Sequence, residues 1–237
     1  MNDLPNISIC MPIYNRNNFK QLILYNLKTQ NYPKDKLEFC VDDDGTDPFI
    51  SSNDEKKALE QLIYPIKLNY HYHKNKKTIG AKRNDLTKMA SYKIIACMDS
   101  DDIYLPDYLL YSISVMNKEK ASCVGSNQML FIYPLHNFST HAIRCEAKRQ
   151  IHEASMIYTK KHHRSMGGFK NNSQGEGSKM ADFNEKNVAL TDIDKIMICI
   201  VHPDNTINKD MFMKDDNKID ITLPQELLDM ILEIITK

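Results

Sequence analysis

The chain lacks any apolar run that approaches the ~18 residues needed to cross a membrane, and residues 1–5 show no secretory leader. It also lacks an excess of charge, since 31 Lys and Arg balance 31 Asp and Glu. A balanced charge gives no general attraction to nucleic acid or to an anionic membrane. We therefore expect no nucleic-acid partner and no membrane span, and any phosphate must be bound by local groups.

The six cysteines form no Cys-x-x-Cys pair, which argues against a redox motif or a zinc ribbon. Most of them stand in apolar runs that read as strands. This pattern predicts buried, reduced thiols and a cytoplasmic protein. The cysteines are Cys10, Cys40, Cys97, Cys123, Cys145 and Cys199.

Glycine is scarce, with seven residues in 237. All but Gly125 lie in expected loops, which suggests positions that need a positive φ or a close approach of the backbone. The loop glycines are Gly45, Gly80, Gly167, Gly168, Gly175 and Gly177.

Short apolar runs alternate with amphipathic helical stretches in the first half of the chain. This alternation predicts an α/β fold with a mostly parallel sheet, right-handed crossovers and flanking helices. Two later apolar stretches predict further strands, and the strongly amphipathic tail predicts a C-terminal helix beginning near Pro224. The expected strands cover residues 7–14, 37–41, 67–72, 94–98, 123–133, 155–158 and 196–201.

Three carboxylates follow the buried strand at residues 94–98, namely Asp99, Asp101 and Asp102. Ligands of open α/β sheets bind at the carboxyl ends of the strands. Carboxylates crowded there repel one another unless a cation joins them. Mg²⁺ and Mn²⁺ both suit such oxygen ligands. The alternative is a solvated acidic turn before the helix at Pro106.

Five short motifs occur in one order, and together they resemble family-2 glycosyltransferases with the Rossmann-like GT-A fold over about residues 5–205. We expect a GT-A domain over residues 1–221 and, over 222–237, a helix that packs on the domain or begins a further module. The motifs are Pro-Ile-Tyr-Asn-Arg (12–16), Val-Asp-Asp-Asp-Gly-Thr-Asp (41–47), Gly-Ala-Lys-Arg-Asn (80–84), Met-Asp-Ser-Asp-Asp (98–102) and Gly-Gly-Phe (167–169) followed by Glu176.

The resemblance implies a nucleoside diphosphate sugar donor, with UDP as the expected nucleotide. Asp43 is expected to accept the ring N–H of uracil, although the extra aspartate leaves Asp42 or Asp44 open. Arg83 would reach the base or the diphosphate, and Lys82 is expected to be solvated. The implied donor-site residues are Pro12, Tyr14, Asn15, Arg16, Asp43, Asp44, Gly80, Lys82, Arg83, Asp99 and Ser100.

The resemblance also implies a divalent metal, Mn²⁺ or Mg²⁺, held by Asp101 and His202, with Asp99 at the ribose or the metal. The metal would stabilise the charge that develops on the diphosphate as the sugar leaves. An imidazole ligand suits Mn²⁺ better than Mg²⁺. The alternative for His202 is a purely structural role at a strand end.

Glu176 is the expected catalytic base, and the family implies direct transfer with inversion at the anomeric carbon. The family's second carboxylate is replaced here by Gly177. Two other functions stay open: a nucleotidylyltransferase, although no Gly-x-Gly-Thr-Arg loop follows the first strand, and a nucleotide-sugar-binding module without activity. A homodimer through residues 224–236 is a further hypothesis.

Overall fold

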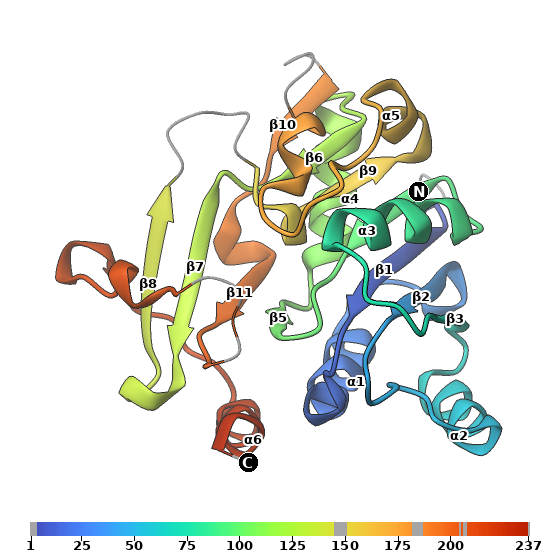
Figure 1. Cartoon of the computed structure of the whole chain (residues 1–237). Coiled ribbons are helices and arrows are strands. Elements are labelled where there is room, and N and C mark those ends of the chain that lie inside the picture. The colour runs from blue at the N-terminus through green and yellow to red at the C-terminus, as the bar shows by residue number, and fades with distance from the viewer. Residues whose placement is uncertain (1–3, 145–150, 182–186, 204, 206–207, 237) are drawn as a thin grey trace.

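The computed structural model (Figure 1) describes residues 4–144, 151–181, 187–203, 205 and 208–236. Its strands are β1 (Ile7–Ile13), β2 (Leu37–Asp43), β3 (Lys67–Tyr72), β4 (Ile94–Cys97), β5 (Asp102–Tyr104), β6 (Cys123–Gly125), β7 (Gln128–Tyr133), β8 (Ser139–Arg144), β9 (Ile157–Thr159), β10 (Val188–Leu190), β11 (Met197–Ile200) and β12 (Lys218–Ile219). Its α-helices are α1 (Lys20–Thr29), α2 (Asn53–Ile63), α3 (Ile79–Met89), α4 (Tyr108–Lys118), α5 (Lys160–Ser165) and α6 (Gln225–Thr236).

The main sheet has the strand order β10-β6-β9-β4-β1-β2-β3. β1 pairs in parallel with β2 and β4, and β2 pairs in parallel with β3, whereas β9 runs antiparallel to β4 and β6. The predicted α/β fold with a mostly parallel sheet is therefore confirmed. Since β1, β2 and β4 point the same way, the polar residues that follow them meet at one edge of the sheet.

A second sheet, with the order β12-β8-β7-β11-β5, lies beside the first and was not expected (Figure 1). The prediction of one strand over residues 123–133 is wrong, because β6 and β7 belong to different sheets. Ser126 stands at the break, where its hydroxyl accepts the backbone N–H of Gln128 at 3.1 Å. A run of apolar residues does not reveal such a bend, since both strands are buried.

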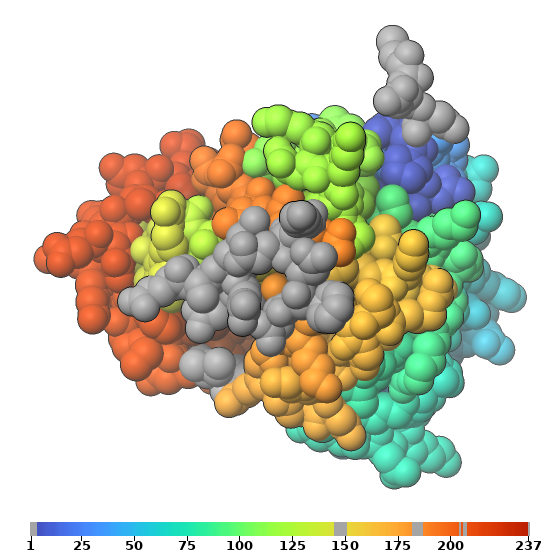
Figure 2. Space-filling view, turned by 90° about the horizontal axis from the view of Figure 1, so that it is seen from above, coloured from blue at the N-terminus to red at the C-terminus, as the bar shows by residue number. Residues whose placement is uncertain are grey.

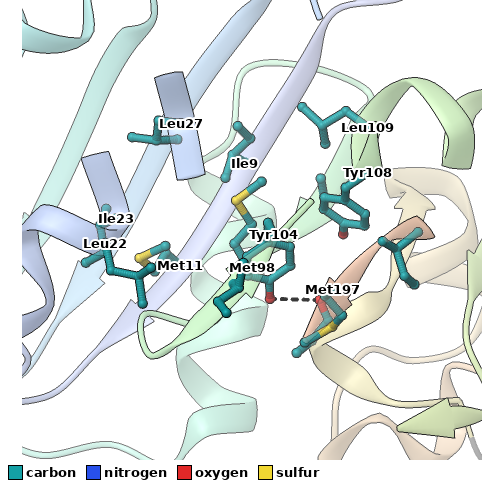
Figure 3. Close-up of a cluster of buried hydrophobic side chains, with 14 of the residues drawn as sticks. Ile9, Met11, Leu22, Ile23, Leu27, Met98, Tyr104, Tyr108, Leu109 and Met197 are labelled. Atoms are coloured by element: carbon teal, nitrogen blue, oxygen red, sulfur yellow. Dashed lines mark hydrogen bonds between the residues drawn. The ribbon is translucent and has the colours of Figure 1, made fainter. Parts of the chain in front are cut away.

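Both faces of the main sheet are covered, which explains why the central strands are mostly apolar. Alternate residues of β1 (Ile7, Ile9 and Met11) join the core that includes α1 and α4, and Figure 3 shows part of that cluster. Cys10 points to the other face and packs with Leu86 of α3. Five cysteines are free and buried, as predicted. Cys145 lies outside the described residues.

Helix α6 lies next to α1 below the sheets, as Figure 1 shows. It buries Leu227, Ile231 and Ile234, which are spaced for one helical face. The helix thus packs on the domain; the domain boundary near 221 and the dimer through 224–236 stay predictions. Seen from above, the C-terminal and N-terminal parts lie on opposite sides of the molecule (Figure 2). Over the described ranges, no helix has both the length and the apolar character that a bilayer crossing requires.

Candidate functional site

A cavity of about 360 Å³ opens at the carboxyl edge of β1 and β4. Residues from three of the predicted motifs and Glu176 reach it, although these segments are far apart in the sequence. The predicted residues that line it are Pro12, Tyr14, Arg16, Lys82, Arg83, Asp99, Ser100, Asp101 and Glu176. The arrangement follows from parallel pairing, which brings the strand ends and the start of α3 together.

Arg83 is the buried cation of this cavity, with 3% of its surface exposed. Its Nη2 donates to Asp99 Oδ1 at 2.8 Å, and its Nε donates to Glu176 Oε1 at 3.0 Å. Burial alone would lower the pKa of Arg83, but the charges of Asp99 and Glu176 raise it well above its usual value. Nη1 is buried and has no hydrogen-bond partner among the described residues. It is a donor that an anionic ligand would satisfy.

Asp101 and His202, the predicted metal ligands, are in contact, and their role at a metal stays a prediction. His202 Nε2 lies 3.0 Å from Asp101 Oδ2, and Arg16 Nη2 donates to the same oxygen at 3.3 Å. Burial would raise the pKa of Asp101, but the hydrogen bond to His202 and the charge of Arg16 hold it at about 2. An ionised carboxylate oxygen beside an imidazole nitrogen is a donor set that fits Mn²⁺. Asp99 lines the same cavity.

Lys82 is not solvated, so that expectation is wrong. Only 3% of Lys82 is exposed, and its Nζ donates to Asp44 Oδ1 at 2.6 Å and to the carbonyl of Ile13 at 2.9 Å. Burial lowers its pKa, although Asp44 opposes the shift. The first turn of α3 places Lys82 inward, behind the N-cap in which Thr78 accepts the N–H of Ala81. The ammonium therefore joins the ends of β1 and β2 under the cavity.

Asp43, expected at the uracil, has both carboxylate oxygens engaged within the chain. The N–H of Gly45 donates to Oδ1 at 2.9 Å, while the N–H of Phe49 and the hydroxyl of Tyr70 each donate to Oδ2 at 2.7 Å. Asp44 accepts from Lys82 and from the N–H of Lys77. Neither carboxylate lines the cavity, and the uracil contact stays a prediction.

Asn15 and Gly80 also stand behind the cavity. Asn15 joins two loops, since its Oδ1 accepts the N–H of Asp47 at 3.2 Å. A Cβ on Gly80 would lie 1.8 Å from the carbonyl oxygen of Lys170, so glycine is required for the loop before Glu176 to cross the start of α3. These two residues shape the site, and direct contact with a nucleotide stays a prediction.

Several cavity residues escaped the sequence analysis, among them His152, Glu153 and Lys209. The segment that carries His152 and Glu153 has no strand or helix periodicity, so nothing in the sequence marked it. Lys209 also borders a neighbouring cavity of about 320 Å³ that reaches His202. Burial would lower the pKa of Lys209, but nearby anions including Asp102 and Asp101 raise it.

Asp42, His71 and His73 form a separate group whose ligand atoms all lie within 4.8 Å of one another. Within the described part of the chain, it is the only group of three or more possible metal-binding side chains that lie this close together. Asp42 is buried, and its Oδ1 lies 2.7 Å from His73 Nε2. However, the ammonium of Lys77 already lies 2.8 Å from His73 Nε2. The strand-end carboxylates also have cations beside them, Arg16 at Asp101 and Arg83 at Asp99. These carboxylates line the cavity, and the metal there stays a prediction.

Replacing His152 with Gln should flatten the acid side of the stability profile. Burial lowers the pKa of His152 to about 4 from 6.5, so the folded chain disfavours protonation. Its stabilising contribution is present above pH 6.5 and is lost as the pH falls toward 4. We expect the difference in unfolding free energy between wild type and His152→Gln to change by about 2 kcal/mol between pH 7 and 4. Urea denaturation at several pH values measures it; parallel profiles would contradict the prediction.

The chain resembles known proteins in sequence and in fold. Residues 8–182 match the model of the family described as glycosyl transferase family 2. The chain is 36% identical over 121 residues to a UDP-Glc:alpha-D-GlcNAc-diphosphoundecaprenol beta-1,3-glucosyltransferase of Escherichia coli, covering 51% of this chain and 45% of that protein. It is 34% identical over 115 residues to a poly(ribitol-phosphate) beta-glucosyltransferase of Bacillus spizizenii, covering 47% of this chain and 18% of that one. It thus spans less than half of either relative.

Two solved structures share the fold. S. aureus TarS 1–349 in complex with UDP-GlcNAc superposes with a TM-score of 0.63 at 15% identity, covering 84% of this chain and 60% of that one. The mannosyltransferase PcManGT from Pyrobaculum calidifontis, in complex with GDP-Man and Mn²⁺, gives a TM-score of 0.63 at 18% identity, with 89% and 59% covered.

Proposed function

Since the chain belongs to glycosyl transferase family 2, we propose that it transfers a sugar from a nucleoside diphosphate sugar, with UDP as the nucleotide, to an acceptor hydroxyl. The supporting observation is the cavity of about 360 Å³, at which residues of three separate motifs and Glu176 converge. The E. coli relative is named for a UDP-Glc donor, and TarS was solved with UDP-GlcNAc. We keep the cytoplasm as the proposed location, because the described cysteines are free thiols.

We assign the donor to the two ends of the cavity by charge. Tyr14 and Lys82 line the end of the cavity near Asp44, and the charge of Lys82 is already paired with Asp44. We therefore assign the uncharged nucleoside to this end. Arg83 Nη1 is a buried donor without a partner in the described chain. A diphosphate oxygen would accept a hydrogen bond from it. Arg16 and Lys209 add positive charge to the same cavity. Fixed cations stabilise the charge on the leaving diphosphate without reorganising.

Asp101, His202 and Asp99 would hold a divalent metal, Mn²⁺ by preference, because their oxygen and nitrogen donors fit that ion. When bound, the metal supplies a Lewis acid for the diphosphate oxygens. The chain's own groups orient the sugar and the acceptor, and transfer in a single displacement inverts the anomeric configuration. The two alternative functions can be told from glycosyl transfer by their products. A nucleotidylyltransferase releases diphosphate, and a binding module without activity releases nothing.

A calorimetric titration with UDP, in the presence and absence of Mn²⁺, tests the proposal. We expect binding that Mn²⁺ strengthens, followed by release of UDP from UDP-glucose or UDP-GlcNAc. Asp192→Asn is the matched control, since Asp192 is an exposed carboxylate outside the cavity and should leave binding unchanged. Binding that ignores Mn²⁺ would remove the metal role. Failure to bind UDP, GDP or dTDP would overturn the proposed function.

A further inference from the structure

The carboxylates that line the cavity differ in whether a cationic side chain is already paired with them. Asp99 and Glu176 share the guanidinium of Arg83, and Asp101 contacts His202 and Arg16. Glu176, the base expected from the sequence, already uses its Oε1 to accept the hydrogen bond from Arg83 Nε at 3.0 Å. A general base needs a carboxylate oxygen that the acceptor hydroxyl can reach, and Glu176 has one oxygen fewer to offer.

Glu153 lines the same cavity from the short 3-10 helix η4 (Glu153–Ser155) and is free of such a partner. Among the described residues no cation lies within ion-pair distance of it. Its Oε1 accepts the backbone N–H of Gly177 at 3.1 Å. Burial, and then the charge of Glu176, raises the pKa of Glu153 above its usual value. A raised pKa brings a carboxylate closer to the operating pH, which strengthens it as a base.

Gly177 makes the room in which Glu153 stands. A Cβ on Gly177 would lie 2.4 Å from Glu153 Cγ and 3.1 Å from its Oε1, so any side chain at position 177 would displace Glu153. The carboxylate of Glu153 therefore occupies the space beside Glu176 into which residue 177 would otherwise project. At the position beside Glu176, the carboxylate thus comes from Glu153, which lies in an earlier segment of the chain, and not from residue 177.

The backbone beside Glu153 is fixed by the core. The hydroxyl of Tyr104 donates to the carbonyl of Ala154 at 3.1 Å and accepts the N–H of Asp99 at 2.7 Å. Tyr104 is buried within the cluster that Figure 3 shows. One side chain thus ties the loop of the strand-end carboxylates to the segment of Glu153. The distance between the two is set by packing, which catalytic geometry requires.

We propose that Glu153 is the general base that deprotonates the acceptor hydroxyl, and that Glu176 is a positioning residue that orients Arg83. The inference rests on the proposed glycosyl transfer. The acceptor oxygen forms a bond to the anomeric carbon as its proton passes to the carboxylate of Glu153. The bond from that carbon to the diphosphate oxygen breaks, and its electron pair leaves with the nucleoside diphosphate.

Release of UDP from UDP-glucose and UDP-GlcNAc, with water as acceptor, tests the inference in Glu153→Gln and Glu176→Gln. We expect Glu153→Gln to lower kcat by roughly 10²–10⁴-fold while the Kd for UDP stays unchanged. Wild-type kcat should rise with pH through the raised pKa of Glu153, and the rise should disappear in Glu153→Gln and return in Glu153→Asp. Glu176→Gln should raise KM and Kd instead, and keep the pH profile.

Gly177→Ala is a second test that leaves every carboxylate in the chain. It should lower kcat about as much as Glu153→Gln, and it should cost nothing further in a Glu153→Ala background, where Cγ is gone. A Glu153→Gln variant within threefold of wild type, or loss of the pH dependence in Glu176→Gln alone, would overturn the inference and leave the proposed function standing. Wild type that neither binds UDP nor releases it would remove both.

Discussion

Asp101→Ala should abolish the effect of Mn²⁺ on UDP binding and lower UDP release by about 100-fold, which corresponds to ~3 kcal/mol of transition-state stabilisation. Asp101 is the carboxylate that His202 and Arg16 both approach. It stays ionised because those groups hold its pKa at about 2 against the effect of burial. Removing it deprives a metal of its anionic ligand. Arg16 and Lys209 still line the cavity with their positive charges, so binding of UDP without metal should persist.

The measurement is a pair of UDP titrations, with and without Mn²⁺, on Asp101→Ala, Asp101→Asn and wild type. Mn²⁺ should strengthen binding by about tenfold or more in wild type alone. Asp192→Ala, which removes an exposed carboxylate outside the cavity, controls for the loss of one negative charge. If Asp101→Ala still responded to Mn²⁺ as wild type does, the metal would have to be held elsewhere, and Asp42, His71 and His73 would be the next group to substitute.

The strand-end residues were predictable because one rule governs them. Parallel strands place their carboxyl ends at a common edge, so Asp99 after β4 and Arg16 after β1 had to come near each other once the strands were recognised. Arg83 follows from the same logic, since α3 returns from β3 and begins at that edge. Short motifs in a fixed order therefore predicted the strand-end residues of the cavity and the arginine that faces them.

The remaining features depend on packing that no local pattern reports. Lys82 reads as a surface residue, and only the placement of Asp44 below it explains its burial. Glu153 sits in a segment without periodicity, and its role is visible only once Gly177 is seen to leave space for it. The second sheet was not predicted for a related reason. The hydroxyl of Ser126 accepts the backbone N–H of Gln128 between β6 and β7, and this local bond is not visible in an apolar run of sequence.

The second large effect concerns stability, and Arg83→Met should lower the free energy of unfolding by roughly 3 kcal/mol. Methionine fills a similar volume but leaves Asp99 and Glu176 without their shared cation. The side chain of Glu176 is 6% exposed, so its charge cannot be solvated in place. Asp99 is 29% exposed and recovers some hydration, which keeps the expected loss at the lower end. Arg83→Lys should not rescue fully, because one ammonium cannot reproduce the guanidinium's two directions.

Urea denaturation gives the loss as a shift in midpoint at constant slope. Lys88→Met is the matched control on the same helix, because the ion pair of Lys88 with Asp85 is exposed and should be worth less than about 1 kcal/mol. Adding Glu176→Gln to Arg83→Met should recover part of the stability, since the uncompensated charge is then removed. A cost for Arg83→Met no larger than that for Lys88→Met would mean that the two carboxylates find other partners. Arg83 would then be held for the ligand alone, through the donor at Nη1 that has no partner among the described residues.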